Sequence, residues 1–231
     1  MEGLFVVGLL VLVAAGAYWG WYQKKKRREA LVFAARQLRL EYSQIDTSGC
    51  LDLPFTLLQK GDGRGTENAV WGSWQDMPVR EFDYWYYTES TDSDRHRSKS
   101  YRYFSCAVTE IEAACSPVTI VRENLLTRLA DAVGMDDIAF ESQEVNDAMK
   151  AKDRRFANDL IDQRMMGWFL SSAPGFRFET CGRWLLCFGD RRKPLELIPL
   201  LGTLRRFRDQ VPRVVFGLYP LATAAPPGSL A

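Results

Sequence analysis

The chain opens with one unbroken apolar stretch. Residues 3–22 read GLFVVGLLVLVAAGAYWGWY and hold no charged side chain. At about 1.5 Å of rise per residue, a helix of this length spans a hydrocarbon core of about 30 Å. The pattern therefore predicts a transmembrane helix over residues 3–22.

The residues that flank this stretch predict its direction in the membrane. Aromatic side chains that favour the headgroup level close the stretch, at Tyr18, Trp19, Trp21 and Tyr22. A basic run follows at once, at Lys24, Lys25, Lys26, Arg27 and Arg28. The positive-inside rule then places the N-terminus outside and the chain after Gln23 in the cytoplasm. We expect a single-pass protein of the cell membrane, with Trp19, Trp21 and the basic run as its membrane-interface residues.

Two other interpretations of the apolar stretch have weaker support. A cleaved secretory signal carries its positive charges before the apolar segment, whereas here they follow it. Gly16 and Gly20 form a Gly-x-x-x-Gly pair that could let two helices approach closely and form a homodimer. Glycine is common in membrane helices, so the pair alone is weak support for a dimer. The basic run could also attract anionic membrane lipid, at roughly 1 kcal/mol per charge.

Beyond the basic run the pattern changes from helical to strand-like. Leu31, Ala34, Ala35 and Leu38 recur at helical spacing, which predicts a basic juxtamembrane stalk over residues 23–39. From Pro54 onward, short runs separated by turn-rich segments predict an antiparallel meander. The candidate strands are FTLLQ, NAVWGSW, VREFDYWYY, YRYFSCAVTEI, PVTIV, GFRFET and RWLLCFG. We expect turns at GDGRGT, at QDMP and at Cys181–Gly182, and a polar hairpin tip over residues 91–100.

Helical periodicity falls mostly in the second half of the chain. A capped helix is predicted from Asn124 to Gly134, a second over residues 156–170, and a third within residues 195–210, where Pro199 leaves the start open. Runs of strands followed by helices are typical of the α+β class. We therefore predict a cytoplasmic α+β domain over residues 40–220, with an antiparallel sheet and three or four helices, and a disordered tail over residues 221–231.

Composition and charge narrow the range of functions. The 30 Lys+Arg nearly balance the 29 Asp+Glu, and a net charge of +1 gives no global field that would attract nucleic acid. The 13% aromatic content argues against a disordered chain. Five widely spread cysteines favour reduced thiols over a disulfide framework. With His96 as the sole histidine and no Cys-x-x-Cys, we expect no metal site and no cofactor.

Several segments contain residue types that take part in chemistry in other proteins. Gly61, Gly63 and Gly65 lack the Gly-Lys-Ser/Thr ending of a phosphate loop, and a turn explains them better. His96 lies in a charged loop and is expected to be solvated. Asp83 sits inside an aromatic strand, where a structural hydrogen bond is the simpler expectation. We predict no catalytic residue.

The aromatic strand EFDYWYY leaves two interpretations open. Alternation along a strand places Phe82, Tyr84 and Tyr86 on one face, and Trp85 and Tyr87 on the other. A central strand packed on both sides is favoured, because both faces carry large aromatic side chains that need to be covered. Alternatively, Trp85 and Tyr87 form a surface for a protein partner.

The chain also resembles a known family. The segments that carry the resemblance are NAVWGSW, PVREFDYWYYTE, PVTIVREN and LLTRLADAVG, with the stretch over residues 159–182. They are similar to a family of uncharacterised actinobacterial single-pass membrane proteins. The resemblance covers most of the chain from Gly3 to Tyr219 and implies an N-terminal span followed by a cytoplasmic domain of unknown function. It implies no catalytic residues, and residues 144–153 depart from its more aromatic pattern.

Two functional hypotheses follow. The first is a non-enzymatic, membrane-anchored cytoplasmic module that binds a protein partner or the inner-leaflet surface. The alternative is an enzyme that acts on a membrane-proximal substrate through carboxylates such as Asp83 and Glu179. A deep pocket with converging acids would favour the enzyme, and a shallow sheet face would favour the module.

Overall fold

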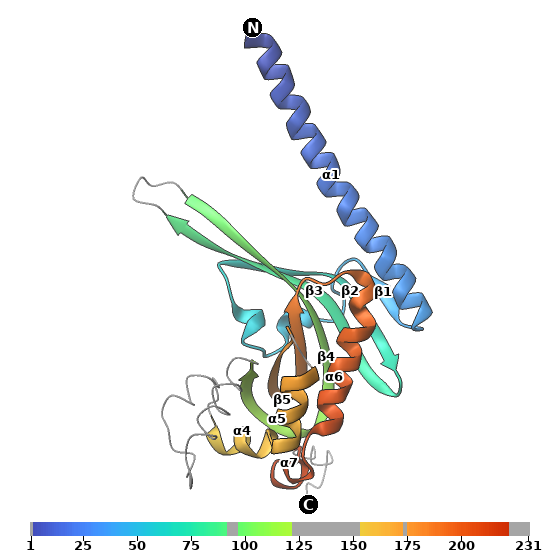
Figure 1. Ribbon diagram of the computed structural model, residues 1–231, viewed down its shortest axis with the longest axis vertical. Coiled ribbons are helices and arrows are strands. Elements are labelled where there is room, and N and C mark those ends of the chain that lie inside the picture. The colour runs from blue at the N-terminus through green and yellow to red at the C-terminus, as the bar shows by residue number, and fades with distance from the viewer. Residues whose placement is uncertain (1, 92–96, 122–152, 173–174, 222–231) are drawn as a thin grey trace, which may run out of the picture.

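A computed structural model describes residues 2–91, 97–121, 153–172 and 175–221 (Figure 1). The helix α1 (Glu2–Gln37) projects from a domain built on one antiparallel sheet. Among the described residues, α1 is the one helix that is long and apolar enough to cross a membrane, by length and composition. Its apolar segment is not buried against the domain. An apolar N-terminal helix followed by an α+β domain is the fold class predicted from the sequence.

Within the described residues, the sheet is a meander of five strands. Its strands β1 (Glu41–Ser43), β2 (Gly63–Trp74), β3 (Met77–Thr91), β4 (Arg97–Ile120) and β5 (Arg177–Asp190) lie side by side in sequence order. Every neighbouring pair is antiparallel. At the β2–β3 turn, Gln75 and Asp76 both adopt left-handed backbone conformations, with φ of 49° and 63°. Two such residues suit a two-residue hairpin turn, because that turn matches the twist of the strands. The turn predicted at QDMP is therefore confirmed.

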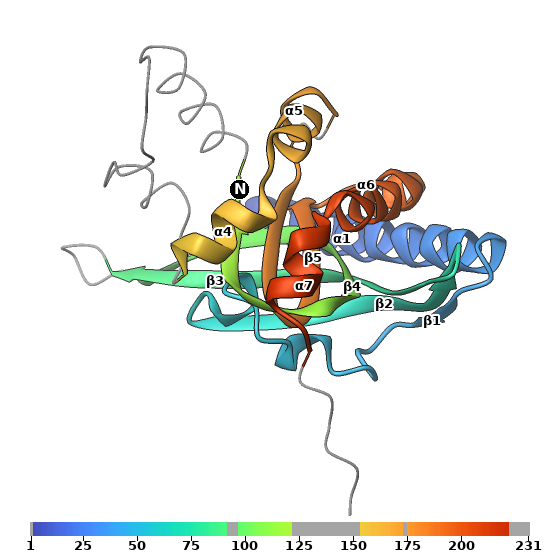
Figure 2. The same cartoon turned by 90° about the horizontal axis from the view of Figure 1, so that it is seen from below.

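Helices cover one face of the sheet, which we call the helix face (Figure 2). In the part of the chain that the structure describes, the helices that pack there are α4 (Arg154–Leu160), α5 (Gln163–Ser172), α6 (Leu197–Gln210) and α7 (Arg213–Leu218), together with the last turns of α1. Their buried side chains form one core with Val79, Ala107 and Leu185 of the sheet. The sheet residues that alternate with these along each strand point to the opposite face, away from the helices.

The other face, which we call the loop face, is covered by the segment between β1 and β2. This segment holds two short 3₁₀ helices, η1 (Cys50–Asp52) and η2 (Leu57–Gln59). Phe55, Leu57 and Leu58 are buried there against Phe82 and Leu186. A strand would send Leu57 and Leu58 to opposite faces, whereas a 3₁₀ turn lets both reach the sheet. The prediction of a strand at FTLLQ is therefore wrong.

Two long strands continue through positions where the sequence predicted that one strand ends and another begins. PVTIV is not a separate strand but the end of β4, which continues across two register shifts opposite β5. GFRFET and RWLLCFG form the single strand β5, in which Gly182 takes a left-handed conformation, with φ of 58°, opposite Cys115. The turn predicted at Cys181–Gly182 is therefore wrong. The chain has a β-bulge at this position, and the strand continues through it.

One predicted helix is divided in two. The helix predicted over residues 156–170 ends at Leu160 and starts again at Gln163. The Asp162 carboxylate accepts a hydrogen bond from the backbone N–H of Met165 at 2.7 Å, which is the geometry of an N-terminal cap. The predictions for Asn124–Gly134, His96 and the tail after Leu221 lie outside the described residues.

The predicted stalk is packed onto the domain. It forms the end of α1, where Leu31 and Ala35 are buried. This part of α1 contacts β1, β2 and the short helix η3 (Pro194–Glu196). The helix therefore does not hold the domain at a distance, and its direction is fixed relative to the sheet.

Candidate functional site

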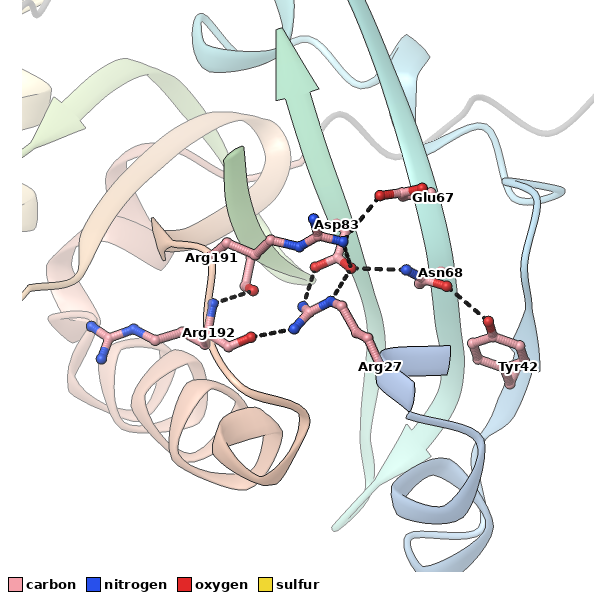
Figure 3. A network of polar contacts seen from close by, with 8 residues as sticks. Arg27, Tyr42, Glu67, Asn68, Asp83, Arg191 and Arg192 are labelled. Atoms are coloured by element: carbon pink, nitrogen blue, oxygen red, sulfur yellow. Dashed lines mark hydrogen bonds and ion pairs between the residues drawn. The ribbon is translucent and has the colours of Figure 1, made fainter. Parts of the chain in front are cut away.

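One arginine of the basic run is part of the domain. The Arg27 Nε donates to Asp83 Oδ2 at 2.7 Å, and its Nη2 pairs with the other oxygen of the same carboxylate (Figure 3). The remaining Arg27 nitrogen donates to the backbone carbonyl of Arg192. The Asp83 side chain is only 2% exposed and that of Arg27 13%. A fork-like, buried pair of this kind is among the strongest that proteins make.

Further donors complete the surroundings of Asp83. Asn68, at the bulge of β2, donates its amide N–H to Asp83 Oδ2 at 2.9 Å and accepts from the Tyr42 hydroxyl at 2.8 Å. Arg191 donates to the same Asp83 oxygen at 3.3 Å and to Glu67 at 3.0 Å. One carboxylate thus connects α1, the sheet and the segment after β5 (Figure 3). The expectation of a structural hydrogen bond at Asp83 agrees with these contacts.

The buried charges shift the pKa of their neighbours. Burial alone would lower the pKa of Arg27, but the hydrogen bond and charge of Asp83 raise it above its usual value. Glu81 lies two residues before Asp83 and is 3% exposed. Burial, and then the negative charge of Asp83, raise the pKa of Glu81 well above its usual value, although Arg27 opposes this. Glu81 Oε2 has no hydrogen-bond partner within the described part of the chain.

A basic cleft lies beside this network, between α1 and the segment after β5. Its volume is about 570 Å³. It is lined by Gln23, Lys24, Lys26, Arg27, Ala30, Arg191, Arg192, Lys193 and Pro194. Six of these residues are cationic and none is acidic, although the guanidinium of Arg192 lies against Phe176 and not in the cleft. We call this feature the basic cleft.

A second feature is an aromatic surface on the hairpin of β3 and β4. Trp85, Tyr87, Tyr101 and Tyr103 lie together on the helix face, beyond the helices, and we call them the aromatic face. Tyr101 is 47% exposed and Tyr103 43%. The Lys99 ammonium lies 4.2 Å from the Tyr87 ring centre.

Glycines in β2 make room for this surface. A Cβ on Gly65 would lie 2.9 Å from the Trp85 ring, and one on Gly63 would lie 2.3 Å from the Tyr87 ring. Both glycines are therefore strand residues beneath aromatic rings, and the predicted turn is limited to Gly61 and its neighbours. The interpretation of GDGRGT as a turn is wrong for Gly63 and Gly65.

The aromatic strand combines the two interpretations that the sequence left open. Phe82 and Tyr84 are buried in the loop-face core, in agreement with a central strand. Trp85 and Tyr87, further along β3, are half-buried and belong to the aromatic face. The predicted division of side chains between the two faces is correct, and the strand changes from core to surface along its length.

The other predicted residues lie apart from these features. Glu179 is buried on the loop face, where it accepts from the Leu57 N–H at 3.2 Å, and burial raises its pKa despite this bond. Trp19 and Trp21 are exposed along α1. No described atom lies within 4 Å of a Cβ built on Gly16 or Gly20. Among the described residues, no group of three or more metal-ligating side chains occurs.

Sequence reasoning missed two parts of the site. Arg27 is predicted from the sequence only as a membrane-interface residue of the basic run, since nothing in the pattern distinguishes it from Arg28. The residues Arg191–Lys193 were not singled out, although three cations directly before Pro194 and a helix were a visible signal.

The fold and the site together define an α+β domain with an N-terminal helix. The first part of this helix is apolar and exposed, and its basic second part packs against the domain. No family model matches the sequence, and no curated protein matches it. A similar solved structure is the mycobacterial trehalose monomycolate transport factor A, TtfA, at 11% identity and a TM-score of 0.49. The match covers 86% of this chain and 97% of that one. That protein comes from a mycobacterium, which is an actinobacterium.

The Arg27–Asp83 pair should contribute strongly to stability. Arg27→Ala leaves a buried carboxylate without its main partner, and breaking such a pair costs about 3–5 kcal/mol. The matched control is Arg28→Ala, because Arg28 is exposed and should change stability by at most about 0.5 kcal/mol. Guanidinium unfolding of the full chain in detergent, followed by tryptophan fluorescence, measures both. Equal effects of the two substitutions would show that the pair is not structural.

Truncation of the chain tests the same ion pair. A chain that starts at Glu29 lacks Arg27, so it should be less stable than a chain that starts at Gln23.

The pH dependence of stability should reveal Glu81. The folded state holds the Glu81 proton more tightly than the unfolded chain does, because the folded-state pKa is raised above the usual value of 4.5. Stability therefore falls as the pH rises from about 4.5 toward the folded-state pKa. Glu81→Gln removes this loss, so the variant should be the more stable protein at pH 7 and should lose that advantage near pH 4. A difference that stays constant between these pH values, in unfolding free energies, would contradict the buried-acid assignment.

Proposed function

We propose that the protein is a membrane-anchored, non-enzymatic module on the cytoplasmic side that binds a protein partner through its aromatic face. The observation that carries the proposal is the aromatic face itself. Four large aromatic side chains gather on one side of a hairpin, and two of them are more than 40% exposed. Tryptophan and tyrosine are the residues that contribute most to binding energy in protein interfaces.

The position of the hairpin supports this assignment. The β3–β4 hairpin extends out of the domain on the side toward which the N-terminal half of α1 points (Figure 1). With α1 in a membrane, the aromatic face is presented near the bilayer surface. A partner that is itself bound to the membrane could therefore reach it without the domain having to turn.

Charge near the aromatic face favours a protein over nucleic acid. Lys99 pairs with Glu89 at 3.2 Å, so this cation is partly neutralised. Binding of single-stranded nucleic acid combines stacking aromatics with a positive groove. The aromatic face instead mixes opposite charges at its edge, which is typical of the polar rim of a protein interface.

The alternative of an enzyme needs acids that converge in an open pocket. Asp83 lies on the helix face and Glu179 on the loop face, and both are buried. Each is held by hydrogen bonds that a substrate would have to displace. The described residues thus give the carboxylate hypothesis no support.

Site-specific photo-crosslinking tests the aromatic face. Tyr103 is replaced by the photo-reactive residue p-benzoylphenylalanine in the full chain, and cells are irradiated before their membranes are isolated. The matched control is the same replacement at Arg102, the adjacent exposed residue, whose side chain points to the opposite face of the hairpin. We expect a discrete protein adduct from position 103 that is absent from position 102 and is weakened by Trp85→Ala. Adducts to lipid alone at position 103, or equal protein adducts at both positions, would refute the proposal.

Reporter fusions test the orientation. Because the basic run follows the apolar segment, the domain should remain in the cytoplasm. Alkaline phosphatase fused after Leu221 should then be inactive, and β-galactosidase fused at the same position should be active. The reverse pattern would place the domain outside and rule out a cytoplasmic module.

A further inference from the structure

We propose that the basic cleft binds the phosphate group of an anionic lipid headgroup in the leaflet where α1 leaves the membrane. The proposal rests on the proposed function only for the position of α1 in a bilayer. It concerns a different surface and a different ligand from the aromatic face.

The charge balance of the basic cleft is positive even after its internal ion pairs are counted. Arg27 and Arg191 are engaged with Asp83 and Glu67, and Arg192 lies 3.7 Å from Glu196. Within the described ranges, by contrast, no acidic side chain pairs with a lysine of the cleft, at Lys24, Lys26 or Lys193. Three unneutralised ammonium groups around one cleft favour a ligand that carries negative charge.

The position of the basic cleft along α1 matches the headgroup layer. Trp21 belongs to the aromatic group that closes the apolar segment, and Gln23 and Ala30, the first and last residues of α1 that line the cleft, lie two and nine residues further on. At about 1.5 Å per residue, the cleft extends from about 3 to about 13.5 Å below Trp21. The headgroup layer of one leaflet is about 5–7 Å thick. The upper part of the cleft thus lies at the depth of lipid phosphates, and its lower part extends toward the cytoplasm.

The two walls of the cleft are fixed relative to each other. Arg27 on α1 donates to the backbone carbonyl of Arg192, and the Arg192 N–H donates to Ser105 Oγ at 3.0 Å. The segment with Lys193 is therefore held at a set distance from Lys24. A site formed in advance loses less conformational entropy on binding than flexible lysines on a free helix would.

One unpartnered donor lies beside the cleft. The Nε atom of Arg191 is buried and has no acceptor among the residues that the structure describes. Buried guanidinium donors are usually satisfied. The Nε atom of Arg192 also lacks an acceptor, but its guanidinium lies against Phe176, on the side away from Arg27 (Figure 3), so only Arg191 adds a donor to a site for an oxygen-rich anion.

Lipid binding by the full chain tests the proposal. The protein is reconstituted in nanodiscs that contain phosphatidylcholine mixed with phosphatidylglycerol, and native mass spectrometry counts the lipids retained after release. We expect the retained lipid to be enriched in phosphatidylglycerol. Lys24→Ser combined with Lys193→Ser should lower the apparent affinity by about tenfold or more, because each cation near a membrane surface contributes about 1 kcal/mol.

The matched control is Lys25→Ser. Lys25 belongs to the same basic run but does not line the cleft, and it lies 4.0 Å from Glu29. Lys25→Ser should keep the enrichment, and both variants should keep the melting temperature because the lysines are exposed. An equal loss with Lys25→Ser would show a general attraction of basic residues to lipid and overturn the proposal. Displacement of the lipid by inorganic phosphate at similar concentration would overturn it in favour of a soluble anion.

The outcome is separable from that of the proposed function. Enrichment of phosphatidylglycerol in nanodiscs depends neither on the orientation of the protein in cells nor on a protein partner. Loss of the Tyr103 adduct with intact lipid enrichment would refute the proposed function alone. Loss of enrichment with an intact adduct would refute the basic cleft alone.

Discussion

The structure depends on how one buried carboxylate is compensated. Asp83 is placed inside the sheet, where an unpaired negative charge would cost several kcal/mol. Its main partner, Arg27, comes from the helix that carries the apolar segment. The domain therefore completes its own interior with a residue from the membrane-proximal helix. The N-terminal helix and the domain are packed together as one unit, and a division between them after residue 39 would separate the two partners of an ion pair.

This constraint gives the basic run more than one role. Positive charge after an apolar helix sets topology, and for that purpose its cations are interchangeable. The domain distinguishes them, because Arg27 turns inward to Asp83 while Lys24 and Lys26 line the basic cleft. Lys25 pairs along the helix with Glu29. Consecutive residues of a helix point in different directions, so the five neighbouring cations of the basic run have different surroundings: the core, the cleft or the solvent.

Local patterns predicted the fold class better than they predicted the site. The apolar segment, the antiparallel meander and the two faces of the aromatic strand follow from periodicities of a single element. The errors at FTLLQ and Gly182 arose where the layers of the domain determine local conformation. Asp83 was noticed because a carboxylate among aromatics needs a partner, but its partner lies 56 residues away. No local pattern carries information on a contact of that range.

The basic cleft and the aromatic face share one side chain. Arg191 lines the cleft and pairs with Asp83, and its guanidinium also lies 5.3 Å from the Tyr103 ring centre. As proposed, an anion in the cleft would compete with Asp83 for this guanidinium, and a partner that moves Tyr103 would change its other contact. Two ligands that act on one side chain are thermodynamically coupled, and each alters the affinity of the other by the same factor. If both proposals hold, a lipid bound in the basic cleft has a direct physical route by which to influence binding at the hairpin.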